Sequence, residues 1–66
     1  MEFIEKNMLS YLIFEGGLFI GQAERIGNDW VFHPRNGLPG PRYSFGCCPL
    51  DAVEQWQARG GKIDGF

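Results

Sequence analysis

Short apolar segments separated by turn-forming residues divide the first 45 residues of the chain. Four of them have the length of strands and are rich in β-branched and aromatic residues: YLIFE, LFIGQAERI, DWVFH and RYSF, at 11–15, 18–26, 29–33 and 42–45. Gly16-Gly17 and Gly27-Asn28-Asp29 suit tight hairpins, because glycine and asparagine tolerate positive φ. The stretch 34–41, with three prolines and two glycines, predicts a longer loop. Because short turns join antiparallel neighbours, we expect a three- or four-stranded antiparallel meander. The first ten residues fit either an extension of the first strand or a short helical turn.

The pattern changes to a helical period after the last strand. Apolar and small residues recur at i, i+3, i+4, i+7 and i+11, which forms one stripe: Pro49, Ala52, Val53, Trp56 and Gly60. Proline suits the first helical position, which puts Cys48 at the N-cap, and Gly60-Gly61 suits a C-terminal stop. The sequence therefore predicts a helix over about 49–59. The expected fold is a single α+β domain, residues 1–66, with this helix on one face of the sheet.

The longest strand indicates which face the helix covers. Strict alternation would place Phe19, Gly21, Ala23 and Arg25 on one face, and Leu18, Ile20, Gln22, Glu24 and Ile26 on the other. Since Gly21 and Ala23 are small, they allow a helix that carries Trp56 to approach closely. We therefore expect the helix on the Gly21 and Ala23 side, with Ile63 and Phe66 folded back onto an edge of the core.

A single helix leaves the second face of the sheet to be explained. At 1.5 Å per residue the predicted helix spans about 16 Å, too little to shield both faces. Yet both faces of the third strand carry large side chains, with Trp30 and Phe32 on one and Val31 and His33 on the other. The uncovered face requires a cover, since burial of each such side chain is worth about 1.5–3 kcal/mol. The N-terminal segment, a second copy of the chain or a partner protein would serve.

Composition and charge exclude several classes of function. The net charge is −2, from six basic and eight acidic residues, which suits neither a phosphate-dominated DNA binder nor an acidic mimic of duplex DNA. The N-terminus lacks the pattern of a signal peptide, and no apolar run is long enough to span a membrane, so we expect a cytoplasmic protein.

Catalytic and metal chemistry find little support in the sequence. One histidine and two adjacent cysteines do not make a zinc site, and no phosphate-binding loop is present. His33 lacks an evident orienting carboxylate, so we interpret it as a structural or surface residue. Cys47-Cys48 could form a nucleophile pair or a redox switch, but we favour a structural role, with Cys47 in the core and Cys48 as the cap. We expect no enzyme activity, no metal and no cofactor.

Aromatic and cationic residues near strands two to four predict a binding surface instead. Tryptophan, tyrosine and arginine dominate the hot spots of protein interfaces. The candidate residues are Arg25, Trp30, Phe32, His33, Arg35, Arg42 and Tyr43. The preferred hypothesis is contact with a protein, including a second copy of the chain. The alternative is a sheet that binds DNA or RNA, with aromatic side chains stacked on bases and arginines on phosphates.

About half of the chain carries a resemblance to small phage proteins. The run IGQAERIGNDWVFHP…RYSFGCCPLDAVEQW resembles a pattern of phage and prophage reading frames in which a G-x-A-x-R…W-x-F hairpin precedes a small-Pro-x-x-Ala-x-x-x-Trp helix. The likeness is carried by Gly21, Ala23, Arg25, Trp30, Phe32, Pro49, Ala52 and Trp56. The order of sheet and helix is also similar to the AP2-like arm-binding domains of phage integrases, which read DNA but carry more lysine and arginine. The resemblance implies an accessory protein of a bacterial host cell, in a group that includes anti-CRISPR inhibitors, which act by steric binding to host machinery.

Overall fold

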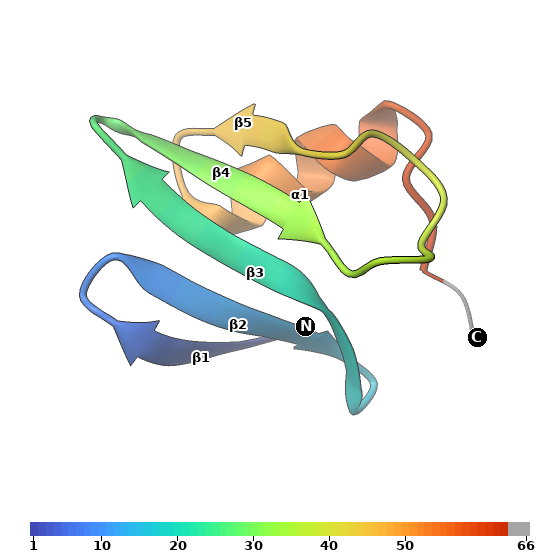
Figure 1. The fold of residues 1–66 in the computed structure, drawn as a ribbon, viewed down its shortest axis with the longest axis horizontal. Coiled ribbons are helices and arrows are strands. Elements are labelled where there is room, and N and C mark those ends of the chain that lie inside the picture. Colours follow the sequence, from blue (N-terminus) through green and yellow to red (C-terminus); the bar gives the residue numbers. More distant parts are fainter. Residues whose placement is uncertain (64–66) are drawn as a thin grey trace.

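A computed structural model describes residues 1–63 as a five-stranded sheet with one helix behind it (Figure 1). The strands pair in chain order, each antiparallel to the next. The elements are β1 Glu2–Asn7, β2 Ser10–Glu15, β3 Leu18–Ile26, β4 Asp29–Pro34, β5 Ser44–Gly46 and α1 Pro49–Ala58. The predicted α+β meander with a C-terminal helix is confirmed, with one strand more than expected.

The additional strand is β1, formed by residues whose structure the sequence left open. It neither extends the next strand nor forms a helical turn, but folds back on β2 as a hairpin, with Ile4 opposite Leu12. The side chain of Asn7 makes the turn, because its Oδ1 accepts a hydrogen bond of 2.9 Å from the backbone N–H of Leu9. No glycine or proline marks this turn, so the usual sequence signal of a hairpin is missing.

Helix α1 follows the predicted pattern closely. Its N-cap is Cys48, whose Sγ accepts a hydrogen bond of 3.4 Å from the N–H of Asp51. Ala52, Val53 and Trp56 are fully buried. The helix ends at Ala58 with Arg59 as the C-cap; Gly60 follows with a φ of 100°, and the N–H of Gly61 donates back to the carbonyl of Trp56 over 3.0 Å. The centre of the predicted stripe, Ala52, Val53 and Trp56, is therefore the buried face that packs on β5, β4 and β3, whereas Pro49 is half-buried and Gly60 is exposed.

A β-bulge in β3 corrects the predicted alternation. Ile13 pairs with Gly21 and Phe14 pairs with Phe19, so Ile20 is an extra residue between the two pairs. The extra residue exchanges the faces of the strand before it: Ile20 is fully buried in the core with Ala23, whereas Phe19 stacks on Phe14 on the opposite face. The helix lies on the Gly21 and Ala23 side as predicted, but the faces of residues 18–20 are the reverse of strict alternation.

The loop after β4 and the segment after α1 close the end of the core. Gly40 and Gly61 lie against the indole of Trp56, and the N–H of Lys62 donates to the carbonyl of Pro39 over 3.1 Å. Ile63 packs on the core as expected, while the prediction for Phe66 falls outside the described residues. β5 is shorter and later than predicted, since Arg42 and Tyr43 precede it. No helix in residues 1–63 combines the length and apolarity that crossing a membrane requires.

Candidate contact surfaces

The pairing registers assign the strand side chains to two faces, because directly opposed residues point to the same side. We call the side that carries α1 the helix face and the other side the outer face. The outer face has three cross-strand rows: Glu2, Phe14 and Phe19; Ile4, Leu12, Gln22 and His33; Ser10, Glu24, Val31 and Phe45. The outer face therefore mixes apolar and polar side chains, with Glu2, Ser10, Gln22, Glu24 and His33 among the apolar ones.

Several apolar side chains of the outer face remain in contact with solvent. Ile4 is 49 % exposed, Tyr43 48 % and Phe45 52 %, while Leu12, Phe14 and Phe19 are half-buried. Tyr43 and Phe45 pack edge to face with their ring centroids 5.4 Å apart, which places Tyr43 on this face too. Residues 1–10 do not cover this surface, since they add β1 and its turn to the edge of the sheet (Figure 1). Of the three covers expected from the sequence, the N-terminal segment is excluded.

Two of the predicted contact residues, Phe32 and Trp30, lie on the helix face rather than the outer face. Phe32 is fully buried and packs on Trp56 with ring centroids 5.2 Å apart, so its assignment to a contact surface was wrong. The reason is the side to which alternate residues of β4 point: Phe32 pairs with Ala23 under the helix, whereas Val31 and His33 face outward. Trp30 shares the helix face but lies beyond the helix, half-buried against Tyr11 at 5.5 Å.

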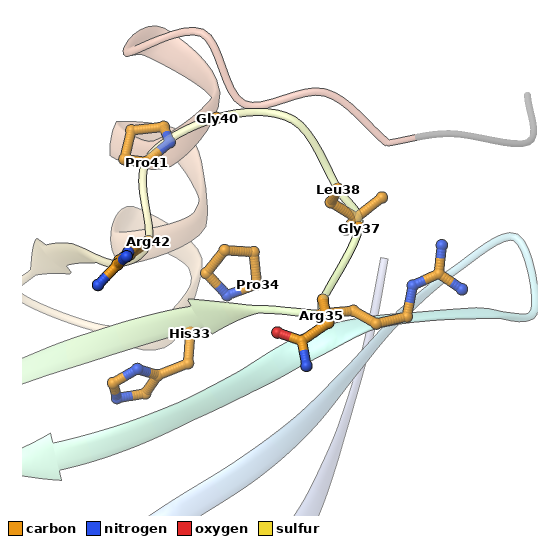
Figure 2. A pocket seen from close by; sticks show the side chains of 9 residues that line it. His33, Pro34, Arg35, Gly37, Leu38, Gly40, Pro41 and Arg42 are labelled. Atoms are coloured by element: carbon orange, nitrogen blue, oxygen red, sulfur yellow. The ribbon is translucent and has the colours of Figure 1, made fainter.

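His33, Arg35 and Arg42 come together around the loop that joins β4 to β5. They line a pocket of about 490 Å³ with residues of the same loop (Figure 2). His33 and Arg42 lie to one side of Pro34, whereas the guanidinium of Arg35 extends to the other side (Figure 2). No aspartate or glutamate lines the pocket, and within residues 1–63 neither arginine forms an ion pair. The pocket therefore carries positive charge, but its cations do not converge on one point.

Arg25 belongs to a different part of the molecule. It pairs with Trp30 at the start of β4, while the loop pocket lies beyond the end of that strand. Its Nε donates a hydrogen bond of 3.2 Å to the carbonyl of Gly27, which holds the side chain over the β3–β4 turn. Of the three arginines that sequence proximity suggested as one surface, Arg25 is therefore separated from Arg35 and Arg42 by the length of β4.

A second hollow lies on the helix face, where α1 leaves part of the sheet uncovered. It measures about 320 Å³ and is lined by Phe3, Tyr11, Trp30, Cys48, Pro49 and Leu50. Strands β1, β2 and β4 supply its aromatic side, and the N-cap and first turn of the helix supply the other. This hollow was not expected from the sequence, because it depends on how far along the sheet the helix begins.

The two cysteines are free thiols at the surface. Cys48 has the predicted capping role, but Cys47 is exposed and not in the core as expected. The negative charge of Asp51 raises the pKa of the Cys47 thiol, while the Cys47 N–H, which donates to the Asp51 carboxylate over 3.0 Å, lowers the pKa of that carboxyl. A raised pKa keeps Cys47 in the less nucleophilic thiol form at neutral pH.

No three potential metal ligands among His, Cys, Asp and Glu gather anywhere in residues 1–63. The site residues that sequence reasoning missed lie on the outer face: Ile4, Leu12, Phe14, Phe19 and Phe45. Alternation along residues 2–6 and 11–15 could have indicated the first three, but Phe19 could not be placed without the bulge.

The comparisons with known proteins give no match: no protein-family model, no curated protein and no solved structure matches this chain.

Proposed function

We propose that this chain is a small non-enzymatic module that acts by contact with another protein through its outer face. The observation that carries the proposal is the exposed aromatic pair of Tyr43 and Phe45 on the β5 side of that face, which pack edge to face and are 48 % and 52 % exposed. Apolar patches on a small domain mark interaction sites, and tyrosine and arginine are preferred at their centres.

The chemistry of the surface also indicates what kind of partner would fit it. The exposed pair of Tyr43 and Phe45 on the β5 side suits an apolar patch, and the basic loop pocket at the end of β4 suits acidic side chains next to it. We propose a host or phage protein with that combination, bound in the cytoplasm of a bacterial host. The resemblance of the hairpin and helix to phage accessory proteins supports a steric, anti-CRISPR-like inhibitor of a nucleic-acid-handling complex.

Affinity capture from a bacterial lysate tests the proposal with a matched pair of variants. Phe45→Ala removes an outer-face side chain that is 52 % exposed, and Leu50→Ala removes a side chain of α1 that is 46 % exposed. A partner that binds the outer face is retained by the wild-type protein and by Leu50→Ala but lost with Phe45→Ala. A partner captured equally by all three proteins would contradict the assignment of the surface.

A specific observation favours nucleic acid as a second candidate. The loop pocket groups Arg35, Arg42 and His33 without a lining carboxylate, and the exposed ring of Tyr43 follows Arg42 directly. Cations beside an exposed aromatic ring are the elements of a single-strand binding surface. Here binding to single-stranded and duplex DNA should weaken steeply with salt, and Arg42→Gln should reduce the salt slope by about one phosphate contact. No retention on either DNA at low salt would exclude this candidate.

A further inference from the structure

The outer edge of β1 has its backbone groups available for pairing. β1 is the first strand of the sheet and pairs with β2 on one side only; among residues 1–63 no strand pairs with its other side. Such an edge is a template for another strand, and it lies far from the opposite edge, where β5 pairs with β4 (Figure 1). The question is which strand fits it.

The sequence of β1 is complementary to itself. A two-fold interface places the same strand on both sides, antiparallel, with the axis normal to the sheet. If the axis passes through Ile4, then on the outer face Ile4 faces Ile4 of the second copy and Glu2 faces Lys6 of the second copy twice over, while on the helix face Phe3 faces Glu5 of the second copy twice. The edge thus offers an apolar pair at its centre and an opposite-charge pair at each end, the combination that stabilises antiparallel neighbours.

The neighbouring two-fold registers lack this match. An axis at Glu5 would place the two Glu5 carboxylates directly opposite each other, which is repulsive. An axis at Phe3 would place Glu2 opposite Ile4 and Met1 opposite Glu5, while the N-terminal ammonium of Met1 is already held 3.4 Å from Glu15 of its own chain. The pairing ends at Lys6, because the register of β1 on β2 shifts between Glu5 and Asn7.

We infer that the outer edge of β1 binds a second copy of this chain, in the register that pairs Ile4 with Ile4 and Glu2 with Lys6. The dimer joins two five-stranded sheets into one of ten strands and places the two outer faces side by side. It covers Ile4, which is 49 % exposed in the single chain. Tyr43 and Phe45 lie at the far side of each sheet and stay free for the partner proposed above, so the dimer does not depend on that proposal.

Cysteine cross-linking tests the register. In a background that carries Cys47→Ser and Cys48→Ser, Ile4→Cys places two thiols at directly opposed positions, within the separation that a disulfide spans. Ile4→Cys should therefore form a disulfide-linked dimer under mild oxidation. Met8→Cys is the control, because Met8 is 86 % exposed at the β1–β2 turn, outside the pairing window. Equal cross-linking of both, or preferential cross-linking of Phe3→Cys or Glu5→Cys, would overturn the register.

Charge exchange tests the pairing without a covalent bond. Glu2→Lys and Lys6→Glu each create two like-charge pairs, and each should weaken the dimer about five- to thirtyfold, as measured by sedimentation equilibrium at low salt. The double variant restores opposite charges and should recover the affinity of the wild-type chain. A wild-type chain that sediments as a monomer at every concentration, or a double variant no tighter than the single ones, would overturn the inference.

Discussion

The two faces of the sheet differ in how their apolar side chains are covered. On the helix face, Ala52, Val53 and Trp56 fill the space over β3 and β4, and every member of the central cluster is fully buried. On the outer face, Val31 is buried by its neighbours, but Ile4 and Phe45 keep about half of their surface in water. Within residues 1–63 a single helix covers one face of the sheet, and the other face has no covering element. The difference separates the residues that fold the protein from those available for contact.

The largest expected effect comes from removal of the central ring of the helix face. Trp56→Ala should lower the free energy of unfolding by about 3–5 kcal/mol, because the cavity lies against Phe32 and two glycines, Gly40 and Gly61, that have no side chain to fill it. For a domain of this size that loss is close to the whole stability. Urea denaturation followed by circular dichroism measures it. An unchanged midpoint would show that the helix face is not the core.

The next effect tests the close approach at the bulge. A Cβ on Gly21 would lie 2.4 Å from the carbonyl oxygen of His33 and 2.7 Å from the ring of Phe32, so Gly21→Ala should cost about 2–3 kcal/mol. Gly17→Ala is the matched control, because that position also has positive φ, at 83°, but nothing within 4 Å. Gly17→Ala should therefore cost less, about 1–2 kcal/mol, from backbone strain alone. Equal losses in urea denaturation would argue against the tight packing.

A smaller effect is expected from the outer face. Phe45→Ser removes a ring that is half in water and should change the free energy of unfolding by about 1 kcal/mol or less. Partner capture should nevertheless fall, since the ring belongs to the proposed contact surface. Thermal unfolding and affinity capture on the same preparation separate the two effects. A loss of stability comparable to that of Trp56→Ala would remove the distinction between the faces.

The smallest effect is a pH dependence at the start of α1. The N–H of Cys47 lowers the pKa of Asp51 below its ordinary value, so the ionised carboxylate stabilises the folded state. The stabilisation is fully present above the pKa of the unfolded chain and is lost as the pH falls through the lower, folded-state value. Asp51→Asn should therefore flatten the decline of stability in acid, which thermal unfolding at a series of pH values measures. Parallel profiles for both proteins would contradict this role of Asp51.

The parts of the fold that depend on local chemistry could be predicted from the sequence. Gly16-Gly17 and Gly27-Asn28-Asp29 mark two hairpins, and the spacing of Ala52, Val53 and Trp56 marks the buried side of the helix. The turn after Asn7 could not be predicted in the same way, because an asparagine side chain makes it where no glycine or proline stands. One strand was therefore left unassigned.

The candidate site was predicted less well, because the sequence did not show which strand residues face the helix and which face outward. His33, Arg35 and Arg42 were grouped from sequence proximity, and the loop does bring them around one pocket. Phe32, however, belongs to the core, because a residue on a two-faced strand serves folding or contact according to which side the helix occupies. Phe19 was assigned to the helix face, and the extra residue Ile20 turns it outward.

The sequence by itself determined the order of hairpins and helix, the cap at Cys48 and the stripe that α1 buries, since each depends on residues within a turn or two of one another. Only the tertiary structure decided that β1 is an edge strand, that a bulge at Ile20 reverses the faces before it, and that α1 leaves the outer face uncovered. These features depend on pairing between strands and on where the helix rests, and one extra residue in a strand is enough to move every side chain before it to the other face.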